Sequence, residues 1–285
     1  EKFPATLGIA VPPSNNTDLR TAGWELELMW KDRLQNGLNY SLRFTLADSR
    51  TKITRYSNPS GLIDSFYEGK YCGEIWGYET IGIARTDDEM AEHVGSLVNG
   101  GQSALGQDWQ AGDIMYSDLN EDGKIDAGAR TLDNHGDLKR IGNTLPNFEY
   151  GFSVALTYKD FDFSTFFQGI GSRDVWAVGQ TGIPGFMPGE GWLEHQMDYW
   201  TPENTDAFYP TPTSHSWINN GQNFLRQTRY LQNMSYLRCK NITLGYTVPE
   251  KWMKVITFTS GRIYVSAENL FEFDHTNIPV DPETT

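Results

Sequence analysis

Long runs of alternating apolar and polar residues constrain the fold of this chain more than any other feature of its sequence. Between Phe148 and Tyr158 a large apolar residue occupies every second position, with small or polar residues between. Successive side chains of a β-strand point to opposite faces, so this period of two predicts a strand with one apolar face. After Lys159 and Asp160 the alternation resumes at Phe161. A two-residue turn would place both apolar sets on one face of a hairpin.

The same alternation recurs elsewhere in the chain. Similar runs cover 24–30, 38–46 and 242–248, and a weaker one covers 263–267. Together with 148–158 and 161–170 they predict about six long strands, at or beyond the top of the usual range of strand lengths. The predicted fold class is therefore all-β with antiparallel strands.

Long strands with unlike faces suit two architectures. A soluble β-sandwich packs the apolar face inside, whereas a transmembrane barrel turns it towards lipid and keeps a polar lumen. Periodicity alone leaves both open. Aromatic residues near the expected strand ends match the girdles of a membrane barrel, and they are Trp24, Trp30, Tyr158, Phe161 and Tyr246.

The connections between the expected strands alternate between very short and very long. The turns at 32–37 and 159–160 are short, so the excursions 49–147 and 171–235 must lie together at the opposite end. Short turns at one end and long loops at the other favour an outer-membrane barrel with long extracellular loops. Excursions of this length must hold structure of their own.

The first excursion contains signals for a strand and a helix. A short strand is expected near 73–78. Thr86 and Glu89 have the spacing of a capping box, with Thr86 as N-cap and Glu89 reaching back, and they open a helix through Met90 and Val94.

Further along, the first excursion carries oxygen side chains at the spacing of a calcium loop. Asp118, Asn120 and Asp122 occupy positions one, three and five, and Gly123 stands at position six, where a sharp turn is needed. Lys124 would contribute its backbone carbonyl, and Asp126 would bind at position nine. Ala129 replaces the usual acidic residue at position twelve, so Asp133, water or another loop would have to complete the site. We expect weak calcium binding, against the alternative of a turn that binds nothing.

Composition limits the classes of partner and compartment. The net charge of −14 and pI near 4.7 argue against nucleic acid, because its binders carry basic stripes. Cys72 and Cys239 match no CxxC or zinc spacing, and isolated thiols are expected. No apolar run approaches the roughly 18 to 20 residues of a membrane helix. The chain opens at Glu1 without a charged-then-apolar leader, so any signal peptide lies outside it.

Catalysis is not expected. The five histidines show neither a catalytic-triad nor a zinc spacing. The acidic residues Glu190, Glu194 and Asp198 lie in a Gly/Pro-rich loop without the paired, rigidly held carboxylates of a glycoside hydrolase.

Several segments together resemble the C-terminal part of SusC/RagA-family TonB-dependent outer-membrane transporters. Their order and spacing cover nearly the whole chain. The resembling segments begin at Thr21 (TAGWELEL), Gly73 (GEIWGY), Gly112 (GDIMYSDLNEDGKID), Ile141 (IGNTLPNFEYGF), Tyr199 (YWTPENTD), Tyr236 (YLRCKNITLGYTVP) and Val265 (VSAENLF).

The resemblance implies a barrel of about 22 strands with a plugged lumen, of which this chain supplies a portion. Residues 1–285 would form a C-terminal part of that barrel, without the plug and the final strand. The resemblance further implies the bacterial outer membrane as location and a SusD-like surface lipoprotein as partner. Import would be driven by TonB, which contacts the plug, and the cargo would be an oligosaccharide or, as the alternative, a peptide.

Four tryptophans of the second excursion are candidates for contact with ligand or partner. They are Trp176, Trp192, Trp200 and Trp217. Indole rings stack on sugar rings, but loop tryptophans also pack their own segment or an interface. A different class of function, a secreted calcium-stabilised β-sandwich acting as carbohydrate-binding module or adhesin, would account for the aromatics and the acidic loop. It would not account for the alternation of short and long connections.

Overall fold

The long strands form one antiparallel sheet. A computed structural model describes residues 15–186, 190–212, 222–255 and 257–283. Its main sheet has eight strands, in the order β1-β2-β7-β8-β10-β11, with β9 and β12 also paired to β10. The strands are β1 (Thr17–Arg33), β2 (Asn39–Tyr56), β7 (Asn147–Tyr158), β8 (Phe161–Ser172), β9 (Asp174–Trp176), β10 (Leu231–Thr247), β11 (Arg262–Glu268) and β12 (Glu272–His275).

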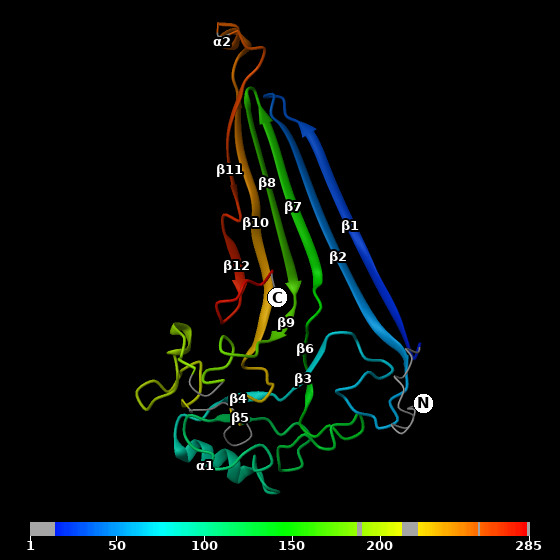
Figure 1. Ribbon diagram of the computed structural model, residues 1–285, viewed down its shortest axis with the longest axis vertical. Helices are drawn as coiled ribbons and strands as arrows, with labels where there is room; N and C mark the ends of the chain where they lie inside the picture. Colours follow the sequence, from blue (N-terminus) through cyan, green and yellow to red (C-terminus); the bar gives the residue numbers. More distant parts are fainter. Residues whose placement is uncertain (1–14, 187–189, 213–221, 256, 284–285) are drawn as a thin grey trace, which may run out of the picture.

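Both predicted hairpins are confirmed. In β7–β8 the register pairs Tyr158 with Phe161, as a two-residue turn requires. β1 and β2 are antiparallel, and their pairs run from Thr17 with Tyr56 to Arg33 with Asn39. The turn between them contains Gly37, whose φ of 88° suits glycine. Figure 1 shows the tight turns and the short helix α2 (Glu250–Val255) at one end of the sheet, and the long excursions at the other.

One face of the sheet is apolar across six strands. Large side chains line up in register from β1 to β11, and many are exposed, such as Leu28 at 56% and Val265 at 74%. The rows on this apolar face comprise Leu26, Leu28, Trp30, Leu42, Phe44, Leu46, Phe152, Val154, Leu156, Phe163, Phe167, Ile242, Leu244 and Val265. In the described part of the chain the remaining sheets have two strands each, so no second sheet covers this face as a sandwich would require.

The opposite face of the sheet is polar. Its pairs include Arg43 with Glu27 at 3.0 Å and Arg262 with Asp162 at 2.5 Å, each across neighbouring or next-neighbouring strands. Between them lie small residues such as Ala155, whose cross-strand neighbours are serines. The unlike faces predicted from the sequence are thus observed over most of the sheet, with Phe166 as an exposed apolar residue on the polar face.

Aromatic side chains mark the turn end of the apolar face. The Trp30 indole donates to the Tyr40 hydroxyl at 3.0 Å, and the rings of Phe161 and Tyr246 lie 4.8 Å apart beside Tyr158. This arrangement matches an aromatic belt at a membrane interface. Trp24, expected near a strand end, instead lies inside β1, because that strand continues to Thr17.

Two strands are longer than the apolar alternation indicates. β2 continues to Tyr56 and β10 begins at Leu231, so both extend into segments that the sequence assigned to excursions. In these extensions the side chains are mostly polar, as in the run from Ser49 to Thr51. Strands without an apolar face still pair through their backbones, but they lose the sequence signal that reveals them.

The excursions fold into a body that we call the loop layer, the described residues between β2 and β7 and between β8 and β10. It contains β3 (Glu74–Gly77) paired with β6 (Lys139–Asn143), β4 (Thr80–Ile83) paired with β5 (Ile114–Tyr116), and helix α1 (Asp87–Ser96). No helix in the described ranges is long and apolar enough to cross a membrane.

Helix α1 begins as predicted, with one difference. Glu89 donates its backbone N–H to the Thr86 hydroxyl at 3.1 Å, so Thr86 is the N-cap. The Glu89 carboxylate, however, accepts from the backbone N–H of Arg85 at 2.6 Å rather than from that of Thr86. The Glu89 side chain therefore caps the backbone N–H of the residue before the N-cap, Arg85, instead of that of the N-cap itself.

Candidate functional site

The loop layer has its own core, which holds the candidate sites in place. Tyr116 and Tyr209 are completely buried in it. The Tyr116 hydroxyl donates to the Gln222 carbonyl at 2.6 Å and accepts from the Gln227 side chain at 3.0 Å. Burial raises the pKa of Tyr209 to about 12. A buried, hydrogen-bonded network of this kind makes the excursions a rigid platform rather than a set of loose connections.

The loop predicted to bind calcium is shaped by hydrogen bonds from backbone N–H groups to its own side-chain oxygens. Gly123 donates to Asp118 Oδ2 at 2.8 Å, Asp122 donates to Asn120 Oδ1 at 3.1 Å, and Lys124 donates to Asp122 Oδ1 at 3.1 Å through their backbone N–H groups. Gly123 has a φ of 82°, as position six requires. The side chains of Asp118, Asn120 and Asp122 thus each accept one backbone hydrogen bond that shapes the loop.

One oxygen in this loop has no partner. Asp118 Oδ1 is buried and accepts no hydrogen bond. An unsatisfied buried carboxylate oxygen is costly, so a bound cation at this position would relieve it. The first ligand position therefore fits a hard cation.

The far end of the loop fits less well. The Lys124 ammonium lies 2.5 Å from Asp126 Oδ2 and holds the pKa of Asp126 below its usual value. Asp126 Oδ1 accepts from the Gly128 backbone at 2.7 Å. Among the described residues no three acidic, histidine or cysteine side chains are grouped closely enough to hold a metal ion. Lys124 was expected to contribute only its backbone carbonyl. Its ammonium instead neutralises Asp126, the ligand expected at position nine.

Asp137 is the residue of this site that the sequence did not reveal. Its carboxylate accepts from the backbone N–H groups of Leu119 at 2.7 Å and Asp126 at 2.8 Å, and burial raises its pKa. It therefore fastens both ends of the loop. Asp133, the substitute ligand considered from the sequence, is exposed. Nothing in the local spacing marks Asp137, because its contacts reach 11 to 18 residues back along the chain.

The four candidate tryptophans have different surroundings. Trp192 packs edge-on against Tyr199, with ring centroids 5.4 Å apart. Trp200 packs against the loop core, and Gly112 approaches it so closely that a Cβ there would lie 2.7 Å from the indole. Its Nε1 is buried without a partner, so Trp200 serves packing in this structure. Trp217 lies outside the described residues.

Trp176 is the candidate that lines a cavity. The cavity lies within the loop layer, beside β3 and β9, and has a volume of about 490 Å³. Trp76 and Phe224 add aromatic surface, and Arg130 and Arg226 bring positive charge. The sequence singled out Trp176 but not Trp76 or the arginines, which come together only through the fold.

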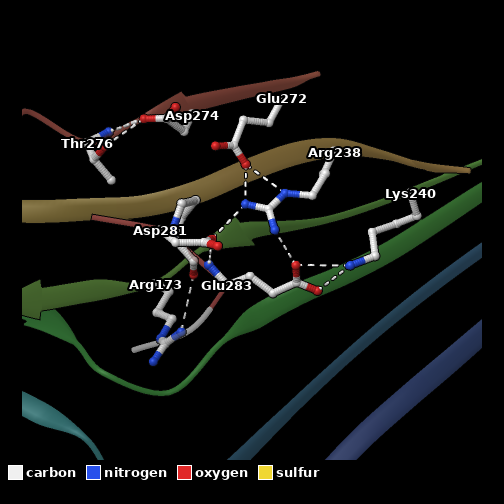
Figure 2. A network of polar contacts seen from close by, with 9 residues as sticks. Arg173, Arg238, Lys240, Glu272, Asp274, Thr276, Asp281 and Glu283 are labelled. Atoms are coloured by element: carbon white, nitrogen blue, oxygen red, sulfur yellow. Dashed lines mark hydrogen bonds and ion pairs between the residues drawn. The ribbon is translucent and has the colours of Figure 1, made fainter. Parts of the chain in front are cut away.

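A second polar cluster ties residues 276–283 to the polar face of β10. Figure 2 shows the Arg238 guanidinium between the carboxylates of Glu272, Asp281 and Glu283. The Arg238 side chain is only 9% exposed, and Lys240 adds a contact to Glu283 at 2.8 Å. These carboxylates therefore neutralise the charges of Arg238 and Lys240.

Comparison with known proteins shows what this chain is similar to. No family model matches the chain. TonB-dependent receptor P3 of Formosa agariphila is 26% identical over 299 residues, which cover 99% of this chain and 27% of that protein. TonB-dependent receptor P26 of the same organism is 25% identical over 289 residues, with the same coverage.

Solved structures show the same fold. The RagAB peptide transporter matches 96% of this chain and 28% of its own with a TM-score of 0.62 at 17% identity. The RagAB peptide importer in its open-open state matches 99% of this chain with a TM-score of 0.64 at 18% identity. The described sheet is thus a portion of a transmembrane antiparallel β-barrel.

The resemblance to SusC/RagA-family TonB-dependent transporters is confirmed by these matches over nearly the whole chain. The chain spans about 27% of the length of the curated receptors that it matches. Those relatives are receptors and transporters rather than enzymes.

Proposed function

We propose that this chain forms part of the barrel wall and of the extracellular loop layer of a TonB-dependent importer in the bacterial outer membrane. The apolar face carries the proposal. It extends across six strands, has many exposed side chains, and ends in an aromatic belt at the side of the short turns. The secreted β-sandwich, the alternative from another class, needs a second sheet over this face, and the described residues form none there.

The cargo that we propose is an oligosaccharide, with a peptide as the alternative. The aromatic cavity at Trp176 supports the first, and the peptide transporters among the structural neighbours support the second. Import would draw on TonB through a plug domain.

We propose a SusD-like surface lipoprotein as the partner that covers the loop layer. Large apolar side chains are exposed there, including Val98 at 83%, Val178 at 66% and Ile81 at 59%. Apolar groups in such a position mark an interaction surface. A permanent complex would bury roughly 2,000 Å² or more.

Deleting the gene of the full-length transporter is expected to abolish growth on the imported oligosaccharide while growth on its constituent monosaccharide continues. Monosaccharides small enough for general porins serve as the control. A tagged transporter purified from outer membranes should bring a surface lipoprotein with it. Unchanged growth on every oligosaccharide and peptide tested, or recovery of the protein in the soluble fraction, would contradict the proposal.

We propose further that the loop 118–126 binds calcium, and the buried, unpartnered Asp118 Oδ1 favours this. Binding requires the Lys124 ammonium to swing away from Asp126, so affinity should be weak, with a Kd of about 0.1 to 1 mM. In calorimetric titration of the full-length transporter, Asp118→Asn should weaken calcium binding at least about tenfold, because it removes a charge and a ligand oxygen. Asp133→Asn, at an exposed neighbouring carboxylate, should leave it unchanged. Equal calcium affinities of wild type and Asp118→Asn would show that the loop is not a calcium site.

A further inference from the structure

The cavity lined by Trp76 and Trp176 combines features that point to one class of ligand. Its walls come from β3, β9 and the segments around Leu105, Arg130 and Leu225, so distant parts of the chain assemble it. Its volume of about 490 Å³ lies within the range of small-molecule sites, roughly 300 to 1,000 Å³. It would accommodate one or two sugar rings.

The two arginines of the cavity differ in their pairing. Arg130 donates through Nε and Nη2 to Asp64 Oδ2 at 3.0 and 2.8 Å, so its charge is balanced at the rim. Arg226 is exposed and has no carboxylate partner among the described residues, while its backbone carbonyl is fixed by the N–H of Tyr78 at 2.8 Å. The backbone thus fixes where residue 226 lies beside the cavity, and in the described part of the chain no carboxylate neutralises its guanidinium.

This local charge is opposite to that of the chain. With a net charge of −14, the protein as a whole repels anions. The cavity, with two arginines and the single carboxylate Asp64, carries a net positive charge. A free guanidinium is suited to bidentate recognition of a carboxylate.

The backbone around the cavity argues against a peptide ligand. Peptides commonly bind by adding a strand to a free sheet edge. Here β3 pairs with β6, and Tyr78 exchanges backbone hydrogen bonds with Arg226 and Thr228. Both edges are occupied at the cavity, so recognition must rest on side chains, and indole faces suit the C–H faces of a sugar ring.

We propose that this cavity binds an acidic oligosaccharide, with a sugar ring against Trp176 and its carboxylate on Arg226. The proposal rests on the importer function argued above and narrows its cargo to sugars that carry a carboxylate.

The test is calorimetric binding to the full-length transporter in complex with its lipoprotein. The probes are a galacturonic acid trisaccharide, its fully methyl-esterified form and triglutamate. Wild type should bind the acidic trisaccharide about tenfold or more tightly than its ester. Arg226→Gln should abolish this difference, and Trp176→Ala should weaken both sugars. Arg85→Gln, at an exposed arginine of the loop layer that is paired with Asp206 outside the cavity, should change neither.

Equal binding of acid and ester, or an acid preference that survives Arg226→Gln, would overturn the proposal. So would triglutamate binding more tightly than the acidic sugar in an Arg226-dependent manner, which would assign the cavity to acidic peptides. These failures leave the importer function intact. That function is tested separately by growth of the deletion strain, which can fail even where the cavity binds sugar.

Discussion

Phe152→Arg is expected to prevent assembly of the full-length barrel. Phe152 lies in the middle of β7 on the apolar face, between Phe44 and Phe167 on the neighbouring strands. An arginine near the bilayer midplane costs about 2 to 4 kcal/mol in such barrels, and here it would be surrounded by aromatic rings. Heat-modifiable gel mobility of the outer-membrane fraction measures the folded population.

Ala155→Arg is the matched control on the same strand. Its cross-strand neighbours are Ser41 and Ser164 on the polar face, so the guanidinium would meet polar groups. This variant should assemble nearly as well as wild type. Equal loss of assembly in both variants would mean that β7 tolerates no arginine on either face, and equal tolerance would mean that neither face contacts lipid.

Arg238→Met is expected to release residues 276–283 from the sheet. The change leaves the carboxylates of Glu272, Asp281 and Glu283 close together without the guanidinium that joins them. Removing one partner from a fully buried ion pair typically costs about 3 to 5 kcal/mol. These carboxylates are partly exposed, at 27 to 42%, so water screens them and the loss should be smaller, although three contacts are lost at once. Limited proteolysis of the transporter should then cut within this segment, where wild type resists.

Arg55→Met is the control for Arg238→Met, because it removes an arginine whose ion pair is exposed rather than buried. Arg55 also pairs with a carboxylate through two hydrogen bonds, at 2.6 and 2.9 Å from Asp18, but both side chains are more than half exposed. Exposed pairs contribute little, so proteolysis should be unchanged. Rapid cleavage in both variants, or in neither, would show that Arg238 does not hold the segment.

The faces of the sheet could be predicted because they follow from a local rule. Residues 148–158 alternate strictly, 161–167 alternate except at Thr165 and Phe166, and a short turn fixes their register. Lipid contact requires a large apolar side chain at every second position, so the pattern survives wherever the strand crosses the membrane. Outside that zone the requirement ends. The start of β10 at Leu231 and the end of β2 at Tyr56 were therefore missed.

The candidate sites were only partly predictable, for a related reason. The acidic loop is a local motif, and its backbone hydrogen bonds match its spacing. Asp137, Arg226 and the partners of Arg238 act across long separations, 34 to 45 residues in the case of Arg238. No local pattern records such contacts. Trp200 is the opposite case. Its residue type made it a candidate for ligand contact, but in the structure it packs against the loop core.

The most direct test of the account is the exposure of each residue of β7 to lipid. Single nitroxide labels at positions 150–157 of the full-length transporter in bilayers, with Cys72 and Cys239 replaced by serine, can be compared for collisions with oxygen and with a water-soluble nickel chelate. The apolar face predicts that oxygen accessibility peaks at the even-numbered positions, while the odd-numbered positions stay low. Accessibility without a period of two, or nickel accessibility highest at the even-numbered positions, would contradict the assignment of this sheet to a membrane barrel.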